Sequence, residues 1–292
     1  MLMPFTLSHP AAVLPLMRRP FSRAALVAGA VAPDMPYFVV ATGLPVSAQS
    51  WYEPFVNATT SHTAPGAVTV TLPYALTLWG LFRAGHRPLA SLLPIRVPPP
   101  PPRTARTLIR RAGWIVLSAL IGIATHLLWD AFTHHDGFVV TRAPWLTSTL
   151  VGSLTWARAL QHASTIGGLA ATAVYLWRRR ARLLADQVRT GLSGAKRRLV
   201  LLAVALFTVG GAVAHAWWWL AGPEAATTGL PLSVVVEGVL SDAAKGAGSG
   251  LIGPLVLYAT VWWIWRAVTA ARSRGSGADS VYDDAPRANT TI

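Results

Sequence analysis

Six apolar stretches set the limits on what this chain can fold into. Each is about as long as the roughly 20 residues that an α-helix needs to cross the hydrocarbon core of a bilayer. Because backbone N–H and C=O groups have no water to bind in that core, such a stretch is expected to be helical. The stretches lie near residues 24–44, 64–83, 112–133, 159–177, 199–221 and 250–268. The sequence therefore predicts an all-α, polytopic membrane bundle of about six transmembrane helices.

The first stretch is the weakest, because Pro33, Asp34 and Pro36 interrupt it. Proline removes a backbone donor and clashes with the preceding turn, so a helix breaks there. We expect a broken or re-entrant pair of short helices at the N-terminus. Residues 1–270 are predicted to form one membrane-embedded domain, with residues 271–292 as a disordered cytoplasmic tail.

The basic residues that give the formal net charge of +14 are concentrated in alternate loops of the predicted bundle. Loops 84–111 and 178–198 are rich in Arg and Lys, whereas loops 45–63, 134–158 and 222–249 are poor in them. This alternation is typical of the positive-inside rule and predicts that both termini are cytoplasmic. The expected partner is therefore the lipid bilayer, and no nucleic-acid partner is expected.

The sequence predicts that two low-complexity segments are connectors. The run Pro98–Pro102 predicts a stiff, extended spacer. The GAGSG segment at 246–250 lacks the strand and helix that flank a phosphate-binding loop, so it is interpreted as a flexible connector.

Three ionisable residues interrupt the third apolar stretch. His126, Asp130 and His134 are four residues apart, which places them on one face of a helix. Such groups are costly in lipid and usually mark a functional site. A His/Asp pair at i, i+4 can grip a metal ion from a single helix. In the alternative interpretation, His126 and Asp130 pair with each other, or with another helix, as buried structural polar groups.

Further polar residues gather toward the same membrane face. With no cysteine in the chain, thiolate sites are excluded, and imidazole with carboxylate suits Zn best, with Mn or Fe as alternatives. Three of the candidate ligands also have simpler interpretations: Asp34 as a helix cap, His62 as an interfacial residue, and His9 as a solvated side chain. The metal-ligand candidates are His9, Asp34, His62, His126 and Asp130, and the candidates for proton transfer are His134, in competition with His135, and His162.

Five segments of the chain together resemble a known family. They are PFTLSHPAAVLPL, GAVAPDMPYF, TSHTAPG, GIATHLLWDAFTHHDG and LQHASTIGG. In order and spacing they resemble the DUF4184 family of bacterial membrane proteins, over most of residues 1–177 and only weakly beyond. The resemblance implies a multi-pass protein of the bacterial cytoplasmic membrane.

The order of the motifs is also similar to that of the membrane-bound metal-dependent hydrolases (YdjM-like, DUF457). More distantly, it resembles the zinc-dependent phospholipase C and S1/P1 nuclease architecture. These resemblances imply that Asp34, His62, His126 and Asp130 form the inner ligand set of one metal. They imply that His9, His134 and His162 are ligands of a second site or proton donors. The phospholipase pattern has a further His-x-x-x-Glu pair and an N-terminal tryptophan that are missing here, so one or two metals are expected.

The expected function is metal-dependent hydrolysis, in which an activated water attacks a phosphoester, for example of a lipid, at the membrane surface. Arg142 or Arg158 is the candidate for binding the phosphate. The alternative is a non-catalytic membrane protein whose site is a structural metal site or an ion or proton pathway. His9 poses a conflict, because the charge pattern puts it on the cytoplasmic side. Either a re-entrant fold of residues 5–40 brings His9 to the site, or His9 is not a ligand, or the topology of the first span is inverted. The prolines of this segment favour the re-entrant fold.

Overall fold

A computed structural model of the chain describes residues 6–40, 44–97, 104–134, 136–152, 154–185, 192–222 and 230–282. This part is almost entirely helical, with one two-stranded antiparallel hairpin. The elements are η1 Thr6–Leu16, α1 Arg23–Val31, η2 Ala32–Asp34, α2 Met35–Val40, α3 Glu53–Val56, α4 Ala58–Ser61, α5 Ala64–Gly66, η3 Ala67–Thr71, α6 Leu72–Leu92, α7 Ala105–Thr133, η4 Val140–Arg142, α8 Pro144–Thr147, β1 Thr149–Val151, β2 Leu154–Thr155, α9 Trp156–Leu183, α10 Gly194–Ala221 and α11 Leu232–Tyr282.

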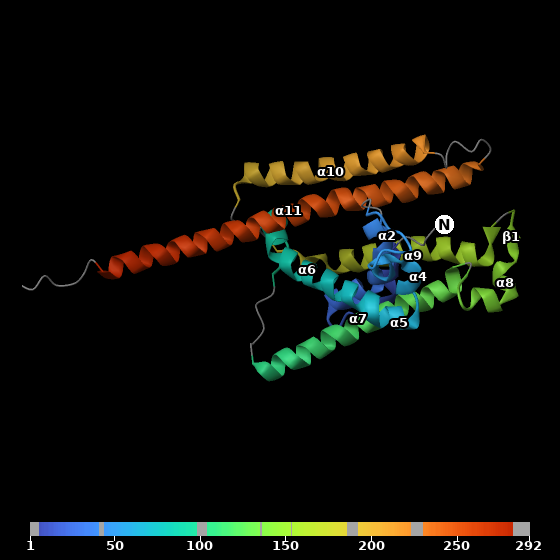
Figure 1. Ribbon diagram of the computed structural model, residues 1–292, viewed down its shortest axis with the longest axis horizontal. Helices are drawn as coiled ribbons and strands as arrows, with labels where there is room; N and C mark the ends of the chain where they lie inside the picture. Colours follow the sequence, from blue (N-terminus) through green and yellow to red (C-terminus); the bar gives the residue numbers. More distant parts are fainter. Residues whose placement is uncertain are drawn as a thin grey trace, which may run out of the picture.

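The short N-terminal elements sit among longer helices (Figure 1). Helices α7 and α9 flank them, while α10 and α11 lie side by side along one edge of the molecule. Helix α6 links the two parts, because the Ser91 hydroxyl lies 2.6 Å from the Tyr258 hydroxyl and the Trp263 indole donates to the Ala84 carbonyl at 3.0 Å. Contacts of α1 with α6 and α7, and of η1 with α9, hold the N-terminal elements inside the bundle.

The interrupted N-terminus has the form that its prolines predict. The segment η1 is a 3-10 helix that contains Pro10 and Pro15. The short turn η2, with Pro33 inside it, separates α1 from α2. The helical pieces are thus short enough to fold back beside one another. His9 lies in the first of them, η1, which contacts α1.

Four helical segments are long and apolar enough to cross a membrane: Ala64–Leu92, Ala105–Thr133, Gly194–Ala221 and Val234–Arg272. They contain the predicted spans 64–83, 112–133, 199–221 and 250–268, the last of them within α11. The predicted spans 24–44 and 159–177 are not among them. The first is divided between α1, η2 and α2, and the second lies in α9, whose C-terminal turn is rich in arginine. Of the six predicted membrane spans, the described part of the chain therefore supports four.

Small residues let α1 and α7 cross in close contact. A Cβ atom built on Gly122 of α7 would lie 2.3 Å from the Leu26 carbonyl oxygen and 2.7 Å from the Ala30 nitrogen. A Cβ atom on Gly29 of α1 would lie 2.1 Å from the Ala119 carbonyl oxygen. Glycine thus allows the two backbones to touch, as small residues do between helices in membranes.

The C-terminal third departs from two expectations. The GAGSG segment is not a flexible connector but a stretch of α11, where Cβ atoms on Gly246 and Gly250 would each lie 2.1 Å from carbonyl oxygens of α10. Its glycines serve helix packing. In addition, α11 continues to Tyr282, so residues 271–282 of the predicted tail are helical. No proline interrupts residues 271–282. Residues 283–292 and the predicted spacer 98–102 lie outside the described residues.

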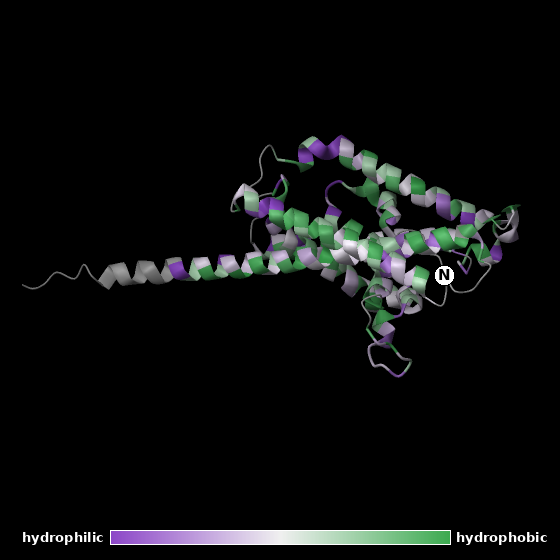
Figure 2. Cartoon of the chain, turned by 90° about the horizontal axis from the view of Figure 1, so that it is seen from above, coloured by the Kyte–Doolittle hydropathy of each residue, from purple (hydrophilic) through white to green (hydrophobic). Residues whose placement is uncertain are grey.

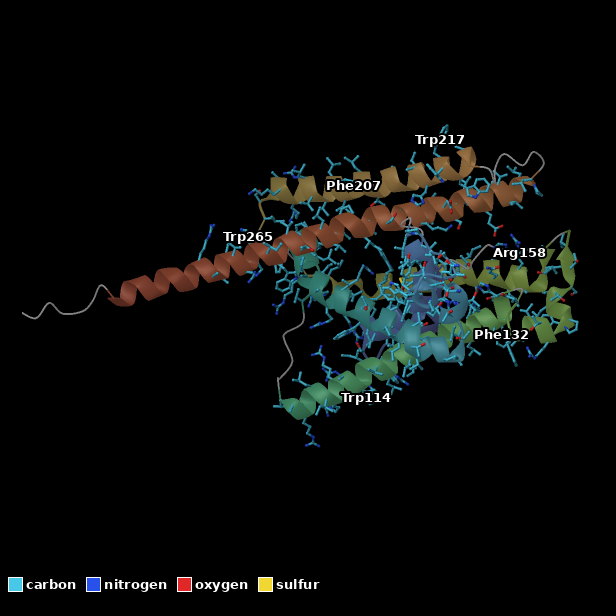
Figure 3. The ribbon with its side chains drawn as sticks, in the orientation of Figure 1. Trp114, Phe132, Arg158, Phe207, Trp217 and Trp265 are labelled. Atoms are coloured by element: carbon cyan, nitrogen blue, oxygen red, sulfur yellow. The ribbon has the colours of Figure 1, made fainter. Side chains whose placement is uncertain are left out.

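Hydrophobic residues recur along α10 and α11 (Figure 2). Many of their apolar side chains are exposed. Phe207, Trp217 and Trp265, labelled in Figure 3, are all more than half exposed. An exposed apolar surface of this extent is unfavourable in water, whereas lipid can cover it. The surface therefore agrees with a helical membrane protein.

Candidate metal centre

Five ionisable side chains from four parts of the chain meet inside the bundle. His126 and Asp130 come from the same face of α7, at 1% and 7% exposure. Asp34 comes from η2 and His9 from η1, and both are buried. His62 follows α4 and is partly exposed. The five residues predicted as metal ligands are thus brought together, including His9.

The donor atoms of this His/Asp cluster (His9, Asp34, His62, His126 and Asp130) lie close to one another. His126 Nε2 is 3.0 Å from Asp130 Oδ2 and 3.4 Å from Asp34 Oδ1. His62 Nε2 is 3.3 Å from Asp130 Oδ2 and 3.7 Å from Asp34 Oδ1. His9 Nε2 is 3.7 Å from Asp130 Oδ1. Two sets of three ligands are close enough to hold a metal ion: His9 with Asp34 and His126, and His62 with His126 and Asp130.

The buried donor atoms of the cluster lack hydrogen-bond partners. Among the described residues, His9 Nε2, Asp34 Oδ2, His126 Nε2 and both carboxylate oxygens of Asp130 are buried without one. Leaving such groups unsatisfied costs about 1–3 kcal/mol each, and more for charged groups. A cation held by either ligand group would satisfy several of these atoms, so the donor set fits a metal ion.

The remaining ring nitrogens fix how the imidazoles point. His126 Nδ1 lies 2.7 Å from the Ala30 carbonyl oxygen, and His62 Nδ1 lies 2.8 Å from the Ala58 carbonyl oxygen. A carbonyl can only accept, so each Nδ1 carries a proton, and each Nε2 is the ring nitrogen that faces the carboxylates of the cluster. Metal-binding histidines usually have an outer partner of this kind. The close crossing of α1 and α7 at Gly122 places the Ala30 carbonyl at the ring of His126.

A model of the family DUF4184, described as a domain of unknown function, matches residues 3–260. The chain belongs to the DUF4184 family. The match continues past residue 177, so it includes the second half that resembled the family only weakly by its motifs. No curated protein and no solved structure matches the chain.

The DUF4184 chain keeps His9 in the neutral form that can bind a metal. Burial, and then the neighbouring His126, lower the pKa of His9 to about 4. At pH 7 its imidazole is therefore uncharged. The ring stacks on that of His126, with centroids 3.8 Å apart.

The two residues predicted to transfer protons occupy different surroundings. His134 follows α7, and its Nε2 lies 3.7 Å from Asp130 Oδ1, without a hydrogen-bond partner. His162 is exposed on α9 and belongs to none of the ion pairs or ligand groups found among the described residues. His135 lies outside the described residues. The structure thus brings His134 to the cluster, while a role for His162 stays a prediction.

The two arginines predicted to bind phosphate already have partners. Arg158, labelled in Figure 3, forms an ion pair with Glu237 at the start of α11. This ion pair joins α9 to α11. Arg142 donates to the Phe138 carbonyl oxygen and lies over the Phe138 ring.

Ser61 is a residue of the site that the motif analysis did not single out. It is fully buried, and its hydroxyl lies 2.7 Å from the Pro33 carbonyl oxygen, 2.9 Å from the Ala58 carbonyl oxygen and 3.1 Å from His62 Nδ1. It therefore joins the segment before Asp34 to the segment before His62. Its position directly before a candidate ligand is the only signal that the sequence offers.

We expect the Ser61→Ala variant to bind metal about 10-fold more weakly than the wild type, in the range seen when the outer partners of metal ligands are lost. The physical reason is that His62 and Asp34 lose the side chain that fixes their relative position. Competition titration with a chelating dye would measure the change. The exposed Ser148, whose hydroxyl donates to the Trp145 carbonyl oxygen of its own turn, provides Ser148→Ala as the matched control. Equal affinities for the two variants would contradict the role of Ser61.

Proposed function

We propose that this protein is a membrane-bound, metal-dependent hydrolase that cleaves a phosphoester at the membrane surface. The observation that carries the proposal is the set of buried His and Asp atoms that converge without hydrogen-bond partners. The side chains of His62 and His134 are 24% and 16% exposed, so the cluster reaches the protein surface at these two residues. A metal site that reaches the surface suits catalysis, whereas a structural site is closed by protein ligands.

The donor set favours zinc, with Mn or Fe as alternatives, because it combines imidazole with carboxylate and contains no thiolate. When bound, such an ion makes a water acidic enough to deprotonate near neutral pH and polarises a phosphoryl oxygen. The ordered His and Asp motifs, which resemble those of the DUF457 membrane hydrolases and the zinc-dependent phospholipases, support this chemistry.

The protein residues would divide the remaining work. Asp34, His62, His126 and Asp130 would hold the ion, and the carbonyl oxygens behind the two imidazoles would keep their rings oriented. His134, at the exposed side of the cluster, would take up and release a proton at Nε2. Arg142 is the better placed candidate for the substrate phosphate, because it has no acidic partner among the described residues.

Exposed aromatic side chains favour a lipid as the substrate. Trp51 and Phe55 precede His62 along the chain, and Phe138 and Trp145 follow His134. Tryptophan side chains such as Trp51 and Trp145 prefer the interface between lipid and water. In this proposal the chain crosses the bacterial cytoplasmic membrane six times with both termini in the cytoplasm, and the site meets the headgroups on the opposite side.

The proposal predicts phosphoesterase activity that depends on metal. Detergent-purified protein loaded with Zn²⁺ would be incubated with mixed phospholipid vesicles, and the release of phosphorylated headgroup or inorganic phosphate would be measured. We expect chelation to abolish turnover and metal to restore it. The variant His126→Ala should lose at least about 100-fold, because a ligand matters at least as much as its outer partners.

The control for this assay is His86→Ala, which removes a histidine that packs against Phe82 on α6, outside the cluster. Activity at the wild-type level in His126→Ala would refute the proposal. Metal that binds stoichiometrically without hydrolysis of any phosphoester lipid would instead favour the non-catalytic alternative, a structural site or an ion pathway.

A further inference from the structure

Three arginines on two neighbouring helices gather far from the His/Asp cluster. Arg83 and Arg87 are four residues apart on α6, so they share one face of that helix, and Arg111 lies on α7. Arg83 is close enough to both of the others to be repelled by them electrostatically. Along α7, Arg111 is about 28 Å from Asp130, because each helical residue rises about 1.5 Å. This arginine cluster (Arg83, Arg87 and Arg111) therefore lies toward the opposite end of the bundle.

The described residues leave the arginine cluster without an acidic partner. The sequence contains no Asp or Glu between residues 54 and 129, and all the Lys and Arg residues in that range are arginines. The ion pairs that Arg or Lys form elsewhere in the described part of the chain go to Glu237 and Asp242 of α11. Since like charges held close together are unfavourable, an anion between them would stabilise the arrangement.

The lengths of the apolar segments place the arginine cluster at the level of lipid headgroups. Residues 64–82 carry no charged side chain and extend about 28 Å as a helix. This length is close to the roughly 30 Å thickness of the hydrocarbon core, and Arg83 follows directly. Arg111 is likewise the last basic residue before the apolar stretch of α7. Arginine side chains at the ends of apolar helices extend to the headgroup layer.

Apolar and aromatic side chains lie beside the arginine cluster. Phe82 is 48% exposed directly before Arg83. The Trp263 indole of α11 donates to the Ala84 carbonyl oxygen at 3.0 Å, so α11 contacts α6 at this point. Next to it, Trp262 is an aromatic residue of the kind that prefers the membrane interface. These surroundings suit a ligand that combines a phosphate with acyl chains better than they suit free phosphate.

We propose that the arginine cluster binds the phosphate of an anionic phospholipid in the leaflet opposite the His/Asp cluster. The planar guanidinium groups can each donate two hydrogen bonds to phosphate oxygens. Basic residues between membrane helices bind anionic headgroups in this way. In the topology of the proposed function, this leaflet is the cytoplasmic one. The lipid is held as a ligand and not cleaved, so the inference does not depend on hydrolysis.

Native mass spectrometry of the full-length protein in a neutral detergent tests this site. Phosphatidylglycerol, phosphatidylcholine and inorganic phosphate would each be titrated in, and the bound lipid would be counted. We expect the wild type to prefer phosphatidylglycerol over phosphatidylcholine by at least about 10-fold, and inorganic phosphate not to displace it. The variant with Arg83→Gln and Arg87→Gln should bind phosphatidylglycerol about 30-fold more weakly, because two cationic contacts are lost.

The matched control is the variant with Arg178→Gln and Arg182→Gln. These two arginines are exposed, have the same spacing on α9 and carry the same charge, so the variant changes the net charge equally. Its affinity for phosphatidylglycerol should equal that of the wild type. Arg111→Gln is a second variant of the cluster and should weaken binding about 5-fold. The melting temperature of each variant shows whether a lost lipid is due to misfolding.

Three results would overturn the lipid site. Equal affinities for phosphatidylglycerol and phosphatidylcholine would show that the headgroup charge is not recognised. Equal losses in the α6 and α9 variants would show a diffuse attraction to basic residues in place of a site. Displacement of the lipid by inorganic phosphate would show that the arginine cluster binds a soluble anion. None of these results bears on the metal site, since no metal or hydrolysis is measured.

Discussion

The Asp130→Asn variant is expected to lose metal binding. Its affinity for the metal should fall by more than the factor of about 10–100 that follows when a metal ligand loses its outer hydrogen-bond partner. Asparagine preserves the shape of the side chain but removes the negative charge and one carboxylate oxygen. Both oxygens of Asp130 face histidine nitrogens of the cluster. Since the variant leaves the imidazoles without their shared anionic partner, we also expect hydrolysis to be lost. Titration of the apoprotein with Zn²⁺ would measure the affinity.

The matched control for this change is Asp242→Asn. Asp242 is a carboxylate on α11 that forms an ion pair with Lys245 of the same helix and belongs to neither ligand group. Its replacement should leave the metal affinity unchanged. An Asp130→Asn protein that binds zinc as tightly as Asp242→Asn would show that the cluster is a set of buried polar contacts rather than a metal site.

The Gly122→Ala variant is expected to weaken both the fold and the metal site, although Gly122 touches no ligand atom itself. Its new Cβ atom would lie 2.3 Å from the Leu26 carbonyl oxygen and 2.7 Å from the Ala30 nitrogen, and both of these are backbone atoms that cannot rotate away. Overpacking of this kind costs about 1–3 kcal/mol. Because α1 must move away from α7, the Ala30 carbonyl would also leave the ring of His126. Thermal unfolding and zinc affinity in detergent would both be measured.

Helix α7 itself supplies the control, Gly113→Ala. A Cβ atom at Gly113 would meet nothing within 4 Å, so the change only replaces a helix-interior glycine by alanine. It should be neutral or stabilise by up to about 1 kcal/mol. If Gly122→Ala unfolds at the same temperature as Gly113→Ala and keeps its zinc affinity, the close crossing does not position His126.

The fold could be predicted where a pattern is local. The hydropathy of residues 64–83, 112–133 and 199–221 led directly to helices, and Pro33 and Pro36 indicated the break before α2. The continuous helix through the GAGSG segment could not be predicted in this way, because its glycines favour a loop locally. Their helical state depends on the contact with α10, which is a tertiary contact.

The ligands of the candidate site could be predicted from the sequence, but the groups that hold those ligands in position could not. His126 and Asp130 stood out because charged groups are rare in an apolar helix, and the motif order added Asp34, His62 and His9. The Ala30 carbonyl that orients His126 has no signature in the sequence, since any residue supplies a backbone oxygen. Which imidazoles the two oxygens of Asp130 face also depends on how α7 and η1 pack, so only the folded chain reveals it.

The central claim is that the His/Asp cluster binds divalent metal, and elemental mass spectrometry of the purified protein tests it most directly. Wild type, His126→Ala and His86→Ala would be expressed in metal-replete medium, purified in detergent and compared. The account predicts up to two equivalents of a divalent metal, zinc first, in the wild type and in His86→Ala, with most of it lost in His126→Ala. Wild-type protein without bound metal, or His126→Ala protein with a full complement, would contradict the account.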